Sequence, residues 1–153
     1  MECPFCDEKT EAAIFGETEY SLAIYNISPL LPGHSLVIPK RHVNTIYDLS
    51  DEEFEDMMFF MRNISDLLRK AYNAEGINWT LQEGEPAGQT VSHLHFHLIP
   101  RNPGDFFDPG DWYPKLKEHQ NIDSAHRSKL TPEQMKEIVQ WLREKSQVVN
   151  LWK

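Results

Sequence analysis

Hydrophobic residues recur along this chain with two spacings, one typical of strands and one typical of helices. Residues 11–16, 20–27, 35–38 and 77–82 are short, largely apolar runs separated by turns that contain glycine or proline, which predicts four strands. Within residues 91–100 polar and apolar side chains alternate strictly from His93 to Leu98, so a fifth, half-buried strand is predicted there. The last two segments flank a single loop and are expected to pair as a hairpin.

A long helix is predicted between the third and fourth strands. Ser50 is placed to cap it, Glu53 completes a capping box, and Gly76 closes the segment. Apolar residues recur there at helical spacing and are expected to form a buried stripe: Phe54, Met57, Met58, Met61, Ile64, Leu68, Ala71 and Tyr72. We interpret this stripe as part of the hydrophobic core, not as a binding surface.

A second helix is predicted over residues 131–146, where Thr131 is the cap, Pro132 takes the first position and Gln134 the box position. Residues 106–130 are rich in proline, glycine and aspartate and are expected to be an irregular surface loop. Strands arranged in hairpins with two separate helices predict an α+β fold with an antiparallel sheet. The length of 153 residues fits one domain, residues 1–153.

Composition and charge exclude several classes of function. The net charge of −9 argues against a nucleic-acid partner, because the chain offers no basic stripe to displace counterions. No apolar run has the length of a membrane span, so no membrane partner is expected. The first residues lack the basic and apolar regions of a secretory signal, which favours a cytoplasmic location.

Three histidines share one face of the predicted fifth strand. His93, His95 and His97 alternate with apolar residues, and side chains two positions apart on a strand point to the same side. Such a row is able to bind a metal ion, or to provide a nucleophile towards phosphorus with neighbours that hold the phosphate. The remaining alternative is an exposed polar face without a function. Three imidazoles in phase favour the two active alternatives.

The turn before this strand offers a candidate anion site. Gly84 and Gly88 allow the backbone amides to approach a ligand closely, and Gln89 and Thr90 carry side-chain donors. The turn lacks the Gly-Lys-Ser/Thr ending of a Walker loop. Considered alone it is a plain hairpin connection, but next to the histidine row it suits a phosphate.

Residues 84–101 resemble the histidine-triad (HIT) family of nucleotide-binding and nucleotide-hydrolysing proteins. The family pattern His-apolar-His-apolar-His-apolar-apolar is met at every position, and residues 31–39 look like the second family hallmark. The resemblance is close over residues 1–105 and loose beyond them. It implies a HIT-like fold, with an antiparallel sheet of about five strands, a long central helix and a C-terminal helix.

The resemblance also implies roles for individual residues. His95 would attack the α-phosphorus of a nucleotide and form a transient nucleotidyl-histidine, which water then hydrolyses. His97 and Gln89 would bind phosphate oxygens, and Thr90 would add a donor near the leaving group. His34 would hold the imidazole network, and Asn26 would contact ribose. Apart from the resemblance, Asn26 and His34 would be interpreted as ordinary turn residues.

The closest resemblance is to the diadenosine polyphosphate hydrolase branch of the family. It implies a hydrolase that acts on a purine nucleotide, forms a homodimer and needs no organic cofactor. Hydrolysis of adenosine phosphoramidates is the alternative activity. A nucleotide-binding module that senses or scaffolds without significant catalysis is the opposing class of function. Acidic residues are abundant and could recruit a magnesium–polyphosphate complex, although a solvated acidic surface explains them equally well.

Cys3 and Cys6 have a C-x-x-C spacing that fits two zinc ligands, a redox couple or two idle thiols. A structural zinc site needs two further ligands, and His42 and His93 are candidates. Some bacterial members of the family carry such a Cys2His2 site, in which the first histidine of the motif binds zinc. The resemblance therefore implies a structural zinc site at these four residues.

Two aromatic side chains of the predicted irregular loop are candidates for contact with a substrate. Trp112 and Tyr113 could stack on a second nucleotide, although an aromatic pair in such a loop more often packs locally. His119 and His126 are interpreted as surface residues.

Overall fold

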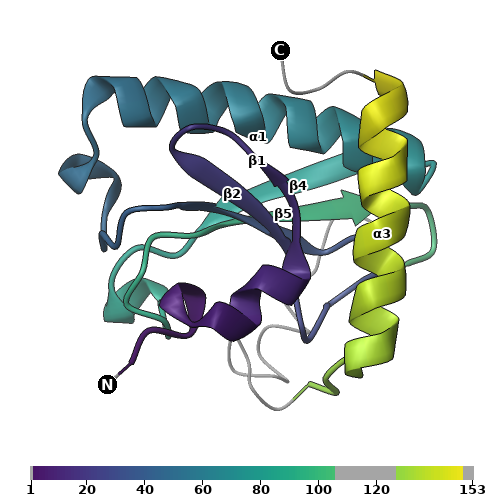
Figure 1. The fold of residues 1–153 in the computed structure, drawn as a ribbon, viewed down its shortest axis with the longest axis horizontal. Coiled ribbons are helices and arrows are strands. Elements are labelled where there is room, and N and C mark those ends of the chain that lie inside the picture. Colours follow the sequence, from purple (N-terminus) through teal and green to yellow (C-terminus); the bar gives the residue numbers. More distant parts are fainter. Residues whose placement is uncertain (1, 106–126, 150–153) are drawn as a thin grey trace.

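A five-stranded antiparallel sheet forms the centre of the protein, with the strand order β1-β2-β3-β5-β4 (Figure 1). The computed structural model describes residues 2–105 and 127–149, the last three of these by backbone alone. The strands are β1 (Ile14–Glu17), β2 (Ser21–Tyr25), β3 (Ser35–Pro39), β4 (Gly76–Leu81) and β5 (Phe96–Arg101). The helices are α1 (Asp51–Ala71), α3 (Pro132–Val149) and four short 3-10 helices, η1 (Pro4–Cys6), η2 (Glu8–Ala13), η3 (Ile46–Asp48) and η4 (Glu85–Ala87). The predicted α+β class is confirmed.

The two faces of the sheet are covered by different parts of the chain. Val37, Leu98 and other buried side chains on one face pack with those of α1 in the main hydrophobic core. On the other face Ile24, Leu36 and Ile38 form a smaller cluster, against which Phe5 packs. Leu36 pairs with His97 across β3 and β5, so the last histidine of the row lies on this second face. The sheet therefore separates the main core from the histidines.

The start of α1 has the predicted capping box. The Ser50 hydroxyl accepts a hydrogen bond from the Glu53 backbone N–H, and the Glu53 carboxylate accepts one from the Ser50 N–H. The predicted stripe is buried at Met57, Met61, Ile64 and Leu68, and partly buried at Met58, Ala71 and Tyr72. Phe54 was predicted wrongly, because its position in the first turn faces outward and leaves it 39% exposed. Phe60 and Leu67, outside the predicted stripe, are fully buried.

The second predicted helix is present as α3, which crosses one end of α1 and packs beside β1 and η2 (Figure 1). Thr131 and Gln134 form the predicted reciprocal cap, with N–O distances of 2.9 and 3.2 Å. Met135, Val139 and Leu142 of its apolar face are buried. None of the helices among residues 2–105 and 127–149 combines the length and apolar character needed to cross a membrane.

Three predicted strands are shorter than the sequence pattern indicates, and β2 covers only Ser21–Tyr25 of the predicted residues 20–27. Residues 11–13 belong to η2, because Asp7 caps that turn through the backbone N–H of Lys9, and β1 begins at Ile14. In the segment 91–100 the strand begins only at Phe96. The Leu94 N–H donates instead to the Val43 carbonyl, at 2.7 Å, which takes this part of the chain out of the sheet. Of the predicted loop 106–130, residues 106–126 lie outside the described residues.

Candidate functional site

The three histidines of the row are brought together, but not on one continuous strand. His93 and His95 precede β5 and His97 lies within it. All three are at most 1% exposed. The ring centroids of His95 and His97 are 5.1 Å apart. An exposed polar face is therefore excluded, and each buried imidazole needs a hydrogen-bonding partner.

A main-chain carbonyl fixes the tautomer of His95. Its Nδ1 lies 2.7 Å from the carbonyl oxygen of His93. A carbonyl oxygen is only an acceptor, so Nδ1 must carry the proton and donate it. In the neutral ring the lone pair is then on Nε2. This is the state in which a histidine acts as a nucleophile.

A second hydrogen-bonded chain orients His97. The backbone N–H of Leu30 donates to Nδ1 of His34 at 2.9 Å, which places the proton of a neutral His34 on Nε2. That Nε2 lies 2.8 Å from Nδ1 of His97 and donates to it. The proton of a neutral His97 is consequently on its own Nε2. His97 is thus oriented to donate a hydrogen bond from Nε2, whereas His95 is oriented to donate an electron pair from Nε2.

The turn that carries His34 is held by the core. Gly33 has a φ of +91°, and a Cβ atom at this position would lie 2.7 Å from Pro100 Cγ and 2.9 Å from Tyr72 Cδ2. Its N–H donates to the Tyr25 hydroxyl at 2.8 Å. Only glycine combines this backbone conformation with so close an approach.

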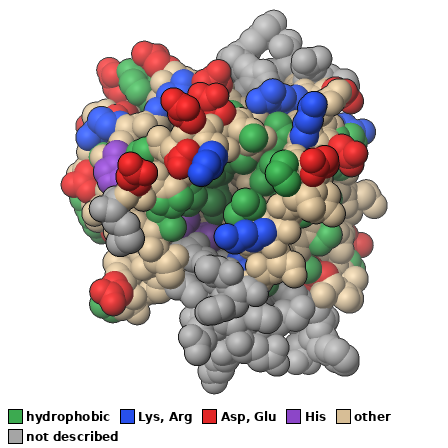
Figure 2. Space-filling model, turned by 60° about the horizontal axis from the view of Figure 1, so that its bottom comes forward, with side chains coloured by type: hydrophobic (Ala, Val, Ile, Leu, Met, Phe, Trp, Pro, Cys, Tyr) green, Lys and Arg blue, Asp and Glu red, His purple; other side chains and the backbone are tan. Residues whose placement is uncertain are grey.

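A cavity of about 390 Å³ has Phe5 and Asn26 in its wall, and these two residues lie next to His95 and His34. Figure 2 shows hydrophobic side chains gathered in a hollow on this side of the molecule, with Lys and Arg side chains near its border. The apolar residues that line the cavity include Phe5, Ala13, Ile24, Ile27, Leu36 and Val91, and its charged lining residues are Asp7, Lys9, Arg127 and Lys129. The Phe5 ring also contacts His95, with centroids 5.2 Å apart. The sequence analysis missed both Phe5 and the three cations, because they come from segments distant in sequence.

The predicted nucleotide-binding residues have structural hydrogen bonds of their own. Asn26 lines the cavity, and its Oδ1 accepts a hydrogen bond from the Ser28 N–H at 2.8 Å. Gln89 closes the 84–90 turn, accepting from the Gly84 N–H at 2.8 Å and donating to the Val91 carbonyl at 2.9 Å. Thr90 is exposed in the same turn. Their assignment to ribose and phosphate stays a prediction.

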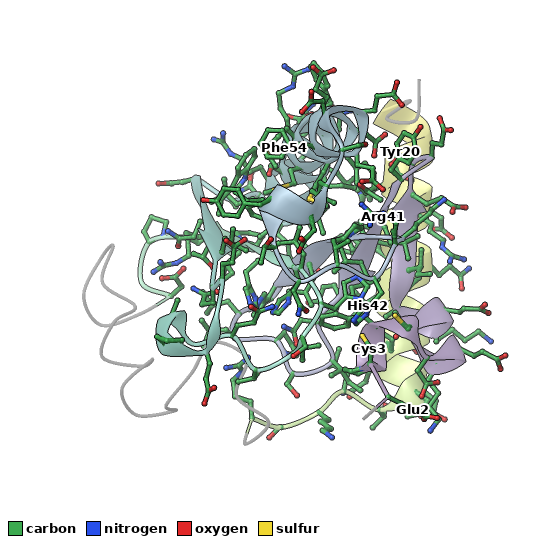
Figure 3. The ribbon with its side chains drawn as sticks, turned by 90° about the vertical axis from the view of Figure 1, so that its left-hand side faces the viewer. Glu2, Cys3, Tyr20, Arg41, His42 and Phe54 are labelled. Atoms are coloured by element: carbon green, nitrogen blue, oxygen red, sulfur yellow. The ribbon has the colours of Figure 1, made fainter. Side chains whose placement is uncertain are left out.

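Cys3, Cys6, His42 and His93 form a cluster whose four donor atoms all lie within 4.8 Å of one another. Figure 3 shows Cys3, from the N-terminal turn, close to His42, which follows β3. The Sγ–Nδ1 distances are 3.4 Å for Cys3–His93, 3.4 Å for Cys6–His42 and 3.6 Å for Cys6–His93. With zinc–ligand bonds of about 2.3 Å to sulfur and 2.0–2.1 Å to nitrogen, tetrahedral geometry separates the two ligand atoms by about 3.6 Å. The donor set therefore fits zinc.

The environment of His93 suits a neutral metal ligand. Burial lowers the pKa of His93, and the neighbouring His42 and His95 lower it further, against the opposing effect of a hydrogen bond to Pro39. Its Nε2 lies 2.9 Å from the Pro39 carbonyl and must donate to it, which directs the Nδ1 lone pair at the two sulfurs. A carbonyl partner on the second ring nitrogen is typical of metal-binding histidines.

The alternative in which the whole histidine row binds one metal ion is not supported. Across the part of the chain that the structure describes, the metal-ligand cluster includes His93 but neither His95 nor His97. The Nδ1 of His95 is committed to the His93 carbonyl. Trp112, Tyr113, His119 and His126 lie outside the described residues.

Comparison with known proteins gives consistent matches. The model of the HIT domain matches residues 7–104. A bis(5'-adenosyl)-triphosphatase of Dictyostelium discoideum is 41% identical over 110 residues, which cover 72% of this chain and 74% of the relative. An asymmetrical bis(5'-nucleosyl)-tetraphosphatase of Schizosaccharomyces pombe is 38% identical over 114 residues, 74% of this chain and 63% of that protein. A Zn-bound histidine triad family protein of Mycobacterium smegmatis superposes with a TM-score of 0.72 at 28% identity, over 98% of this chain and 96% of that one.

Proposed function

This chain belongs to the HIT domain family, and from that premise we propose that it hydrolyses dinucleoside polyphosphates by attack of His95 on the α-phosphorus. The observation that carries the proposal is the hydrogen bond from His95 Nδ1 to the His93 carbonyl. It fixes the tautomer that a nucleophilic histidine needs. The relatives named as hydrolases favour catalysis over a module that only binds nucleotide.

The proposed reaction has two steps. In the first, the Nε2 lone pair of His95 forms a bond to the α-phosphorus while the bond between phosphorus and the bridging oxygen breaks, and the remaining nucleotide leaves with that electron pair. In the second, a water oxygen attacks the nucleotidyl-histidine, releases a nucleoside monophosphate and restores the imidazole. The water proton is taken up by solvent or by the departing imidazole nitrogen. Dividing the reaction into two displacements replaces one high activation barrier with two lower ones.

Other residues are proposed to stabilise the charge on phosphorus. The relay from Leu30 through His34 places the His97 proton on Nε2, where it can be donated to a phosphoryl or leaving-group oxygen. We propose that Gln89 and Thr90 present further donors from the 84–90 turn, and that Asn26 meets the ribose at the cavity wall. Donors fixed before the substrate arrives stabilise developing charge without reorganisation.

The substrate class follows from the cavity and from the relatives. Its lining is mainly apolar with three cations, Lys9, Arg127 and Lys129, which suits a heterocyclic base joined to an anionic chain. The Dictyostelium and Schizosaccharomyces relatives are named for hydrolysis of diadenosine and dinucleoside polyphosphates. We therefore propose adenine-containing polyphosphates as the substrates of this protein.

Mass spectrometry of acid-quenched protein tests the mechanism directly. After millisecond mixing with diadenosine triphosphate, we expect one adenylyl group on the peptide that contains His95. The same experiment with AMP is the control, because AMP has no anhydride bond to break and should leave the peptide unmodified. An adduct on another residue, or turnover without any adduct, would refute the proposed intermediate.

We further propose that Cys3, Cys6, His42 and His93 hold a structural zinc ion. The distances among their donor atoms and the neutral state of His93 support this set. Two thiols that serve as metal ligands suit a reducing compartment, and we place the protein in the cytoplasm on that ground.

Metal analysis checks the zinc proposal. Protein purified without a chelator is expected to contain close to one zinc per chain, and Cys3→Ser protein far less, because a tetrahedral structural site requires all four ligands. Ser92→Ala protein, altered next to a ligand but not at one, is the matched control and should retain the metal. A content below about 0.3 zinc per chain in the unaltered protein would rule out a tightly held structural ion.

A homodimer is proposed from the open side of the sheet. Within the described residues β4 is an edge strand, and an unpaired edge beside apolar side chains favours association. Phe54, Phe59 and Trp79 are 39%, 58% and 45% exposed and line one shallow cavity on this side.

Light scattering coupled to size-exclusion chromatography should give the mass of two chains for the unaltered protein, and Phe59→Glu should shift this mass towards that of one chain. Tyr47→Glu, at an 83% exposed tyrosine outside this cavity, should remain dimeric; a monomeric unaltered protein would refute the proposal.

A further inference from the structure

Phe5 lies next to the metal-ligand cluster and also forms part of the cavity wall. It stands between Cys3 and Cys6 in the η1 turn, and it lines the cavity. Its ring meets His93 and His95 edge-on, with centroids 5.7 and 5.2 Å apart. It also packs on the cluster formed by Ile24, Leu36 and Ile38. A single side chain thus joins two sites that the proposed function treats separately.

The η1 turn is held to the rest of the protein mainly by side chains. Among the described residues the hydrogen bonds of its main chain are local, from the Cys6 N–H to the Cys3 carbonyl at 3.1 Å and from the Thr10 hydroxyl to the Pro4 carbonyl at 2.6 Å. The two histidine ligands come from the body of the protein instead, His42 just after β3 and His93 before β5. An ion bound by all four residues would therefore fasten the turn, and Phe5 with it, to the sheet.

We infer that metal and nucleotide bind this chain cooperatively, and that Phe5 is the positioning residue that couples the two sites. The inference rests on the proposed function only in taking the cavity to be the nucleoside site. When the four ligands are joined, Phe5 is fixed as an apolar wall before the nucleotide arrives. Without the ion, nucleotide binding must also order the η1 turn, which lowers its affinity.

The main chain of His93 extends the same coupling to the nucleophile. Its Nδ1 faces the sulfurs, its Nε2 donates to the Pro39 carbonyl, and its own carbonyl accepts from His95 Nδ1 at 2.7 Å. An ion on His93 thus holds the peptide group that sets the orientation of His95. The four metal ligands would therefore position both Phe5 in the cavity wall and the nucleophile His95.

Thermodynamic linkage gives the inference a two-sided test. If the ion strengthens nucleotide binding by some factor, nucleotide must strengthen binding of the ion by the same factor. Calorimetric titration with AMP is expected to give a dissociation constant about tenfold lower for zinc-loaded than for chelator-treated protein, within the range usual for coupled sites. Competition with a chromophoric chelator should show zinc held more tightly by about the same tenfold factor when AMP is saturating.

Variants distinguish the role of Phe5 from the role of the metal ligands. Phe5→Ala is expected to keep its zinc, because no ligand is removed, but to bind AMP about tenfold more weakly and to lose the effect of AMP on zinc release. Tyr47→Ala, which removes an 83% exposed ring outside the cavity, should behave as the unaltered protein. If chelator-treated protein unfolds, AMP-dependent retention of zinc is compared between unaltered and Phe5→Ala proteins, both folded and loaded.

Each outcome decides the inference. Equal AMP affinity with and without zinc overturns the coupling while leaving the proposed hydrolase activity intact. Persistence of the AMP effect on zinc in Phe5→Ala overturns the role of Phe5. Failure of zinc-loaded protein to bind AMP at all overturns the nucleoside site itself and the proposed function with it.

Discussion

Replacement of His95 by alanine is expected to lower the turnover number for diadenosine triphosphate by about 10⁴-fold or more, as loss of a covalent nucleophile does in other hydrolases. The alanine side chain has no lone pair to form the bond to phosphorus, and the Nδ1 of the neighbouring His97 is engaged by His34. Affinity for AMP should change little, because the cavity lining is not altered. Steady-state kinetics and calorimetry measure the two quantities separately.

The zinc content of the His95→Ala protein is the control for this experiment. His95 is not part of the Cys3, Cys6, His42 and His93 cluster, so the metal should stay at the level of the unaltered protein. Retention of more than a tenth of the original turnover would contradict covalent catalysis and favour a direct attack by water. Loss of zinc together with activity would instead favour His95 as a metal ligand.

Replacement of Gly33 by alanine is expected to lower the free energy of unfolding by about 3 kcal/mol. The left-handed conformation costs about 1–2 kcal/mol for a residue with a Cβ atom, and overpacking of a filled core costs about 1–3 kcal/mol more. The overpacking arises because the Cβ would lie 2.7 Å from Pro100 and 2.9 Å from Tyr72. For a domain of this length the melting temperature should fall by about 10 °C, as measured by circular dichroism.

Gly104→Ala is the matched control for Gly33. Gly104 also has a positive φ, of +78°, but a Cβ atom there would meet no atom of the described residues within 4 Å. Only the conformational cost of about 1–2 kcal/mol remains, so the loss of stability should be clearly smaller. Equal losses in the two variants would show that the Gly33 turn relaxes and that its packing against Tyr72 and Pro100 does not restrain it. Because His34 follows Gly33, the first variant should also reduce turnover.

The sequence determined most of the secondary structure and supplied the candidate residues for the proposed reaction. Capping boxes at Ser50 and Thr131 rest on hydrogen bonds between residues three positions apart, so they are visible in local spacing and both are confirmed. The alternation around His95 is also local, and it correctly separated the buried Leu94 and Leu98 from the histidines. The family resemblance rests on residues 84–101 and 31–39, and the match of the HIT domain to residues 7–104 confirms it.

Only the tertiary structure decided the protonation of the site, the depth of the histidines and the shape of the cavity. The Leu94–Val43 hydrogen bond shortens the predicted strand, and no spacing within residues 91–100 reveals a partner so distant in sequence. The tautomer of His97 depends on Leu30 and His34, and the cavity joins Phe5 to Arg127. Periodicity reports which side of an element a residue faces. It carries no information on which residues of other elements contact that side. The chemistry of this protein depends on those contacts.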